Sequence, residues 1–348
     1  MSDNKRWFYA GTYTGADEQG IFLCVLDMDN GSMEIVHGTD GIANASFLAL
    51  NAAQDRLYAV SETGDGEVCA YAVDGATGKL QLLDRKPTHG SDPCYISLTR
   101  DDTHVLAANY SSGHVNAYRI EGDGKLAEAG LVRHSGGSVN PERQEAAHPH
   151  SVFQDPSGKY VLVCDLGLDE IVIYRLEGGE LQVHNRVKTA PGAGPRHFDF
   201  HPSGRWAYGI NELDDTVNVY AFDAEAGNLQ VMQTLSALPE GAARGSSSAD
   251  IHVTPCGRFL YASNRSDDSI GLYHIDPSTG LLTAVEWVST GGQTPRNFAI
   301  VKGGYLLAAN QNGDSVVSFK IDKDSGRLTP TGHALKLPKP VCIVPVYK

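Results

Sequence analysis

The feature that most constrains this chain is an internal repeat. A glycine followed two residues later by leucine or methionine recurs seven times, at intervals of 46 to 55 residues. Each copy lies between two short segments in which apolar and polar residues alternate. The glycines are Gly31, Gly78, Gly124, Gly179, Gly227, Gly280 and Gly326. Repeats of this length, built from short strands, are typical of the blades of a β-propeller.

Residues 194–235 show the repeated unit most clearly. Four segments, 197–201, 206–210, 216–222 and 229–234, are separated by short runs of Gly, Pro, Asn, Asp and Ser. Period-two alternation bounded by such turn residues predicts antiparallel strands joined by hairpins. We name these strands a, b, c and d, with a innermost.

The first copy of the unit is incomplete. Residues 6–10 match strand b and no strand a precedes them, whereas 340–346 match strand a. We therefore predict an all-β fold: a seven-bladed β-propeller with four antiparallel strands per blade, in which the C-terminal strand closes the first blade. Such closure removes two exposed sheet edges. The expected blades, within one domain over residues 1–348, are 6–36 with 340–347, 45–86, 93–133, 148–187, 194–235, 247–288 and 294–335.

Composition excludes several classes of partner. The net charge of −14 argues against nucleic acid. We find no secretion signal and no run of 18 apolar residues, so we expect no membrane span. The six cysteines are scattered without a CxxC pair, which indicates reduced thiols in the cytoplasm. We see no dominant apolar surface signal and expect a monomer or weak oligomer.

Two insertions mark one face of the expected disc. Residues 136–147 and 236–248 both connect strand d of one blade to strand a of the next. The start of strand a and the end of strand b lie on the same face, because these strands are antiparallel. Extra loop on one face of a repeat scaffold usually marks the binding face.

The same geometry places charged residues at one mouth of the channel. The first residues of strands a and the residues just past strands b should ring this mouth. Blades four to seven place there His150, Arg196, Glu212, Arg265 and Arg296. The insertion before blade four adds Asn140, Arg143, Gln144 and His148. Packing of a propeller requires none of these charges, so we interpret the cluster as a functional site.

Several arginines around a pocket favour an anionic ligand, because guanidinium groups pair with phosphate or carboxylate oxygens two at a time. An arginine can also stabilise the oxyanion formed when water attacks a carbonyl. His150 and Glu212 can serve as general base and acid, in roles that the sequence does not assign. Together these groups suit the opening or closing of a lactone in an anionic sugar acid or a dicarboxylate.

Some of these features also have structural interpretations. Arg196 and Arg296 could form ion pairs between blades, and Glu212 could simply pair with an arginine, although a buried pair at a pocket mouth remains a candidate site. His148 and His150 could chelate zinc, but no third ligand is evident and a polar channel lining is favoured. The acidic pairs at 214–215 and 267–268 lie in turns, where we expect them to be solvated.

Four motifs resemble a known family. They are GGSVNPERQEAAHPHS at 136–151, GPRH at 194–197, INE at 210–212 and SNR at 263–265. These motifs resemble the lactonase-type seven-bladed propellers, which include 6-phosphogluconolactonases and carboxy-cis,cis-muconate cyclases. The resemblance covers essentially the whole chain. It implies a site at the channel mouth without an obligatory metal or other cofactor.

The resemblance also implies a set of site residues and a function. The catalytic set would be His150, Glu212, Arg196 and Arg265. Substrate-binding residues would be Arg143, Gln144, His148, His197 and Arg296. The expected reaction is hydrolysis of 6-phospho-D-glucono-1,5-lactone to 6-phosphogluconate, with a small anionic lactone as the partner and no nucleic acid or membrane. Two alternatives remain open: a muconate-type lactone cycloisomerase, and a non-catalytic propeller that binds a ligand or a protein.

Overall fold

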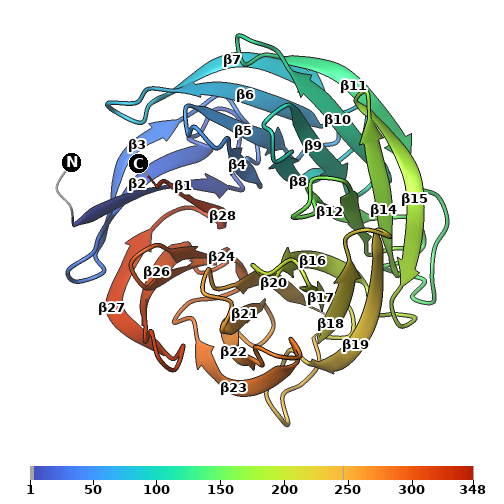
Figure 1. The fold of residues 1–348 in the computed structure, drawn as a ribbon. Helices are drawn as coiled ribbons and strands as arrows, with labels where there is room; N and C mark the ends of the chain where they lie inside the picture. Colours follow the sequence, from blue (N-terminus) through green and yellow to red (C-terminus); the bar gives the residue numbers. More distant parts are fainter. Residues whose placement is uncertain (1–3, 246, 348) are drawn as a thin grey trace.

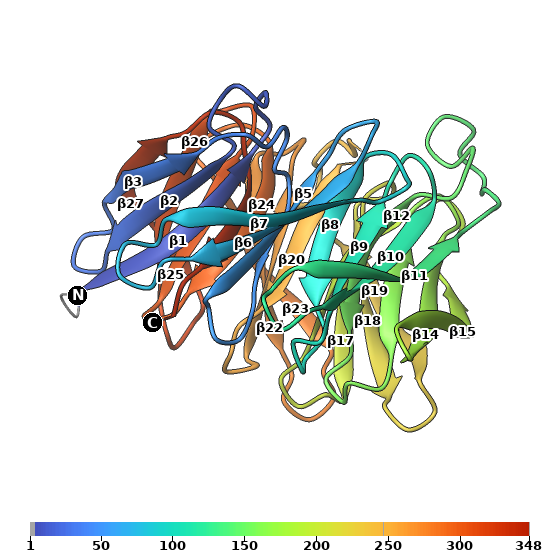
Figure 2. The same ribbon diagram turned by 90° about the horizontal axis from the view of Figure 1, so that it is seen from above.

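The computed structural model describes residues 4–245 and 247–347. Its strands form seven four-stranded antiparallel sheets around a central channel, as Figure 1 shows, which confirms the predicted seven-bladed propeller. Figure 2 shows the same disc from its side, with connecting loops on both faces. In the described part of the chain, no helix is long and apolar enough to cross a membrane.

Each blade runs outward from the channel. The innermost strands are β28 (Pro340–Pro345), β4 (Leu48–Leu50), β8 (Pro93–Leu98), β12 (Pro149–Gln154), β16 (Pro195–Phe200), β20 (Ser248–Val253) and β24 (Pro295–Val301). The second strands are β1 (Lys5–Thr12), β5 (Arg56–Ser61), β9 (His104–Asn109), β13 (Val161–Asp165), β17 (Trp206–Asn211), β21 (Phe259–Asn264) and β25 (Tyr305–Asn310).

The two outer strands of each blade complete the sheets. The third strands are β2 (Ile21–Asp27), β6 (Glu67–Val73), β10 (His114–Ile120), β14 (Glu170–Glu177), β18 (Thr216–Asp223), β22 (Ser269–Ile275) and β26 (Ser315–Ile321). The outermost strands are β3 (Met33–Thr39), β7 (Leu80–Pro87), β11 (Leu126–Arg133), β15 (Glu180–Lys188), β19 (Asn228–Ser236), β23 (Leu282–Ser289) and β27 (Leu328–Lys336).

The first blade is closed by the last strand of the chain, as predicted. Its sheet has the order β28-β1-β2-β3, and β1 pairs antiparallel with β28 through Tyr9 opposite Val344 and Ala10 opposite Ile343. The two ends of the chain therefore lie in one blade (Figure 1). This pairing leaves no open edge at the junction of the first and last segments.

Apolar side chains from neighbouring blades form the core. All six residues of β17 are buried, whereas Leu229 is the one buried residue of the outermost strand β19. Tyr208 of blade five packs in one cluster with Leu260 and Tyr273 of blade six. Inner strands are covered on both faces by adjacent blades, so they carry nearly continuous apolar runs.

Aspartates in the turns between second and third strands hold the blades together. Four of them, with φ between 45° and 54°, are Asp169, Asp215, Asp268 and Asp314. Each side chain accepts a backbone N–H from the connection into the next blade, at Gly194, Ser248, Thr294 and Lys339. Because these connections lead directly into the innermost strands, the aspartates fix the backbone at the channel mouth.

The expectation that these turn acids are solvated is wrong for Asp215. Its side chain is buried and accepts hydrogen bonds from the backbone N–H groups of Ser247 at 3.0 Å and Ser248 at 2.9 Å, and from the Ser248 hydroxyl at 2.9 Å. The turn sequence alone does not reveal this, because the donors come from the next blade. Buried backbone donors need such partners.

We predict that Asp215→Ala destabilises the protein by about 3 kcal/mol, because it leaves the buried N–H and hydroxyl of Ser248 and the partly buried N–H of Ser247 without an acceptor. Urea unfolding followed by circular dichroism measures the change. The matched control is Asp267→Ala, which removes a partly exposed turn aspartate and should change stability by less than about 0.5 kcal/mol. Equal stability of the two variants would contradict the clamping role.

Candidate active site

The inner strands share a backbone irregularity that aims side chains into the channel mouth. The pairing between first and second strands shifts register after the leading proline in four blades. The residue that follows this proline is left out of the ladder. These residues are Cys94, His150, Arg196 and Arg296. An extra residue in one strand re-aims its side chain, so the repeated shift explains how four blades each present one residue there.

Glu212 lies at the centre of an arginine cluster. Its Oε1 atom lies 2.6 Å from Nη2 of Arg143, and its Oε2 atom lies 2.7 Å from Nε of Arg196 and 2.9 Å from Nη2 of Arg265. Arg143 comes from the insertion before blade four, and the other two arginines come from blades five and six. The structure thus brings together four of the residues selected from the sequence.

The arginines decide the protonation state of Glu212. Burial alone would raise the pKa of this carboxyl group, and its side chain is only 5% exposed. Arg265 and Arg196, together with the hydrogen bond from Arg143, outweigh burial and hold the pKa well below its usual range. Glu212 is therefore ionised at neutral pH and has no proton to donate.

Arg196 lies behind Glu212 and is 1% exposed. Its Nη1 atom donates to the carbonyl oxygen of Ala249 at 2.7 Å and to Nε2 of His197 at 3.2 Å. Burial lowers the pKa of Arg196 to about 10, with smaller contributions from Arg265 and Arg296. Since its donors are directed at protein groups, Arg196 orients Glu212 and is shielded from a ligand in the channel.

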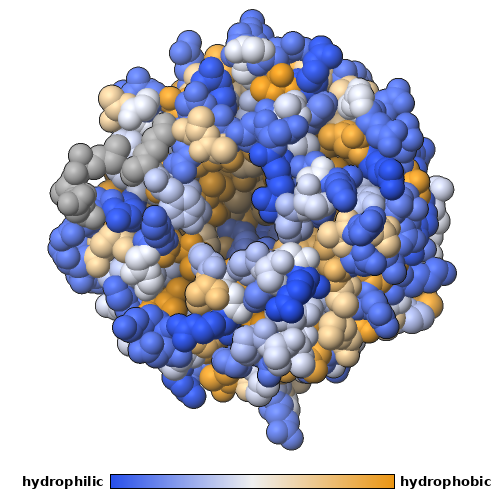
Figure 3. All heavy atoms as spheres, in the orientation of Figure 1, coloured by the Kyte–Doolittle hydropathy of each residue, from blue (hydrophilic) through white to orange (hydrophobic). Residues whose placement is uncertain are grey.

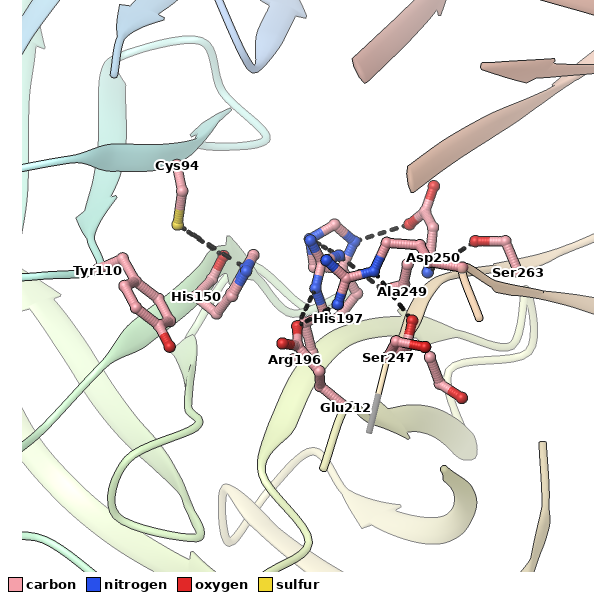
Figure 4. A network of polar contacts seen from close by, with 12 residues as sticks. Cys94, Tyr110, His150, Arg196, His197, Glu212, Ser247, Ala249, Asp250 and Ser263 are labelled. Carbon is pink, nitrogen blue, oxygen red and sulfur yellow. Dashed lines mark hydrogen bonds and ion pairs between the residues drawn. The ribbon is translucent and has the colours of Figure 1, made fainter. Parts of the chain in front are cut away.

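A chain of hydrogen bonds continues from Arg196 through buried His197 and Asp250 to the partly exposed His252, as Figure 4 shows in part. His197 Nδ1 lies 2.7 Å from Oδ1 of Asp250, and Oδ2 of Asp250 lies 2.9 Å from Nε2 of His252. Burial and the charge of Arg196 lower the pKa of His197 to about 4, so its imidazole is neutral. The sequence analysis missed Asp250 and His252, because the chain is formed by three residues from two blades.

His150 lies beside this cluster at the mouth. Its ring meets the rings of Tyr110 and His197 at centroid distances of 5.5 Å and 5.4 Å, and Sγ of Cys94 lies 3.7 Å from Nδ1. Figure 4 shows His150 between Tyr110 and the Arg196 group. Burial, followed by the charge of Arg196, holds the pKa of His150 well below its usual range. The neutral imidazole can accept a proton.

Two other residues expected to bind substrate, Gln144 and His148, contact protein groups in and beside the insertion that carries Arg143. Gln144 is buried, donates to the carbonyl oxygen of Leu166 at 2.9 Å and accepts the backbone N–H of Asn140 at 3.1 Å. His148 stacks on Tyr110 at 4.4 Å and its Nδ1 atom lies 2.8 Å from the carbonyl oxygen of that residue. These contacts position the loop.

Arg296 occupies the opposite wall of the mouth. Its guanidinium lies 5.3 Å from the ring centre of Tyr13, whose hydroxyl is 2.9 Å from each carboxylate oxygen of Glu62. The sequence analysis did not select Tyr13 or Glu62. Glu62 stands directly after strand β5, as Glu212 stands after β17, and this equivalence was the available signal.

Comparisons with known proteins agree with this architecture. The family description "Lactonase, 7-bladed beta-propeller" matches residues 7–345. The chain is 36% identical over 292 residues to a 6-phosphogluconolactonase of Bacillus subtilis, covering 83% of each protein. It is 32% identical over 304 residues to a 6-phosphogluconolactonase of Formosa agariphila, covering 84% of this chain and 85% of the relative.

Solved structures are similar along the whole chain. A structure from Bacteroides fragilis has a TM-score of 0.93 at 33% identity and covers 100% of this chain and 99% of its own. The periplasmic gluconolactonase of Pseudomonas aeruginosa has a TM-score of 0.92 at 32% identity and covers 99% of each chain.

The fold and the site define a class: a propeller with an arginine-bound carboxylate at one mouth of its channel. This chain belongs to the lactonase family of seven-bladed β-propellers. The family resemblance expected from its motifs is thereby confirmed. Some relatives of similar identity have no assigned activity, among them a Lactococcus lactis protein that is 32% identical over 296 residues.

We predict a pH dependence of stability from the chain of hydrogen bonds that ends at His252. Burial opposes the charge of His252, but Asp250 and then Asp199 raise its pKa to about 9. An imidazole whose pKa is raised by folding stabilises the folded state. This contribution is complete at pH values below the unfolded-state pKa of about 6.5, and it is lost as the pH rises through about 9. Melting temperatures should fall between pH 7 and pH 10.

The control for this titration is His252→Gln, which keeps a donor toward Asp250 without the titrating charge. Its melting temperature should be lower than that of the wild type at pH 6 and should vary less between pH 7 and pH 10. Parallel curves for the two proteins across this range would show that another group is responsible.

Proposed function

We propose that this protein hydrolyses 6-phospho-D-glucono-1,5-lactone to 6-phosphogluconate. The supporting observation is the neutral imidazole of His150 beside arginines that are organised on the ionised carboxylate of Glu212. The names of two curated relatives also favour this substrate. Arginine donors suit the two charges that the reaction involves, on the substrate's phosphate and on the oxyanion.

In the proposed mechanism, His150 accepts a proton from water while the water oxygen bonds to the lactone carbonyl carbon. Arg143 and Arg265 are the accessible arginines of the cluster, with side chains 39% and 16% exposed, and they stabilise the resulting oxyanion. When the bond from the carbonyl carbon to the ring oxygen breaks, the His150 imidazolium returns its proton to that oxygen. Product ionisation then releases one proton to solvent.

Glu212 has a different part in this mechanism from the proton donor or acceptor considered from the sequence. Because the arginines keep it ionised, its carboxylate cannot supply the proton that the ring oxygen requires. Glu212 instead accepts hydrogen bonds from three guanidinium groups and so holds them close together. Preorganised donors of this kind lower the cost of oxyanion formation.

A muconate-type cycloisomerase is the second candidate. The same arginine cluster would then bind carboxylates, which guanidinium groups pair with as readily as phosphate. Incubation of the pure protein with phosphogluconolactone, an unphosphorylated lactone and a carboxymuconate, with ring opening or closure followed in each, separates the two reactions. If the protein converts none of the three compounds, the remaining alternative is a non-catalytic propeller that binds a ligand or a protein.

We also propose that the protein works in the cytoplasm as a monomer or weak oligomer. All six cysteines are free, and five of them are buried. Free thiols fit a reducing compartment. Cell fractionation tests the location, which is of interest because one solved relative is a periplasmic gluconolactonase. Light scattering of the pure protein tests the oligomeric state.

We predict that His150→Ala lowers kcat/KM for 6-phosphogluconolactone by about 100-fold or more, since a positioned acid–base group contributes about 10² to 10⁴. Glu212→Gln should lower it by a similar factor, because the arginines lose the charge that aligns them. A coupled assay of 6-phosphogluconate measures both rates after subtraction of spontaneous hydrolysis.

The matched control is Glu142→Gln, which neutralises an exposed glutamate in the insertion that carries Arg143. It should retain the wild-type kcat/KM. Melting temperatures establish that each variant is folded. Unchanged kcat/KM in both His150→Ala and Glu212→Gln would remove these residues from the mechanism.

A further inference from the structure

The channel mouth contains two glutamates at equivalent positions in blades two and five, and their surroundings differ. Glu212 contacts three arginines, as described above. The Glu62 side chain accepts a hydrogen bond from Tyr13 and has no ion pair among the described residues. An ionised carboxylate can accept about four hydrogen bonds. Glu62 is partly exposed, so most of this capacity is available to a ligand.

Arg296 has the complementary property. Among the described residues its guanidinium makes a cation–π contact with Tyr13 and neither a hydrogen bond nor an ion pair. Burial opposes its charge, but Tyr13, Glu62 and Glu212 outweigh burial and raise its pKa. Arg296 is partly exposed and stands at the register shift that aims side chains into the mouth. Its donors are therefore free for an anion.

The two sets of residues lie at the same mouth of the channel. The charge of Arg296 lowers the pKa values of His150, Arg196 and Arg265. Arg296 follows the leading proline of β24 at the register shift, the position that His150 and Arg196 occupy in β12 and β16, so it reaches the same channel mouth. Tyr13, Glu62 and Arg296 come from blades one, two and seven, and the Glu212 cluster comes from blades five and six and the insertion before blade four (Figure 1). Figure 3 shows the disc hollowed at its centre.

We propose that Arg296 and Glu62 select the substrate of the proposed lactonase: Arg296 binds the phosphate, and Glu62, held by Tyr13, accepts hydrogen bonds from sugar hydroxyls. This assignment rests on the proposed function and gives the substrate class, a polyhydroxylated lactone with one anionic end. A carboxylate with open acceptor positions attracts hydroxyl donors and repels further carboxylates. The Glu62 carboxylate therefore disfavours binding of a carboxylated muconolactone.

Three lactones separate the two contacts. 6-Phosphogluconolactone has the phosphate and the hydroxyls, gluconolactone has only the hydroxyls, and δ-valerolactone has neither. The Arg296→Gln variant should lower kcat/KM for the phosphorylated lactone by about 10- to 100-fold and leave gluconolactone unchanged, because one charge-assisted contact is lost. Glu62→Gln should lower kcat/KM for both sugar lactones by about 10-fold and leave δ-valerolactone unchanged.

Tyr13→Phe gives a second measurement of the Glu62 contact. It keeps the aromatic ring beside Arg296 and removes the hydroxyl that holds Glu62. Its effect should therefore be confined to the two sugar lactones. Glu142→Gln again serves as the control and should preserve all three rates. Equal loss on all three lactones in the Arg296 and Glu62 variants would overturn the proposal, because it would indicate a general catalytic or structural role.

Binding distinguishes failure of this proposal from failure of the proposed function. Calorimetry with 6-phosphogluconate and gluconate needs no turnover. Wild-type protein should bind 6-phosphogluconate more tightly, and Arg296→Gln should abolish the difference. If the wild type opens no lactone but shows this preference, the lactonase assignment fails and the phosphate contact stands. If the wild type neither binds nor hydrolyses these compounds, both proposals fail.

Discussion

Antiparallel pairing of the first and last strands is the constraint on which the site depends. Tyr9 opposite Val344 and Ala10 opposite Ile343 close the ring, so that seven sheets share one channel. Closure brings Tyr13 of blade one between Glu62 and Arg296 at the mouth. The core between blades is continuous with this junction, since Phe8 and Ile343 pack with Leu307 of blade seven. Site geometry and ring stability therefore have a common origin.

Within the ring, position along each inner strand decides which residues can meet. The register shift after a leading proline directs one side chain per blade into the mouth, and the turn aspartates hold the backbone just before it. A blade can thus exchange Cys94, His150, Arg196 or Arg296 at this position without rebuilding its sheet. Function in this fold is set by the side chains that a repeated frame presents.

Charge is distributed unevenly between the two walls of the mouth. Glu212 gathers Arg143, Arg196 and Arg265, which leaves a net positive cluster whose geometry is fixed by one carboxylate. Across the channel, Arg296 and Glu62 have few protein partners. In a chain with a net charge of −14, such a concentration of arginine makes this mouth the natural place for an anion.

The repeat spacing and alternation of this sequence determined the seven blades and the closing strand, because each blade is a local pattern of hairpins. They also determined which residues reach the mouth. Only the tertiary structure decided that Asp215 is buried, that Arg196 lies shielded behind Glu212, and that Asp250 links His197 to His252. The contacts of Asp215 and Asp250 come from another blade, and Arg196 donates to Ala249 of blade six. Burial and charge, which set protonation, act across space and independently of distance along the chain.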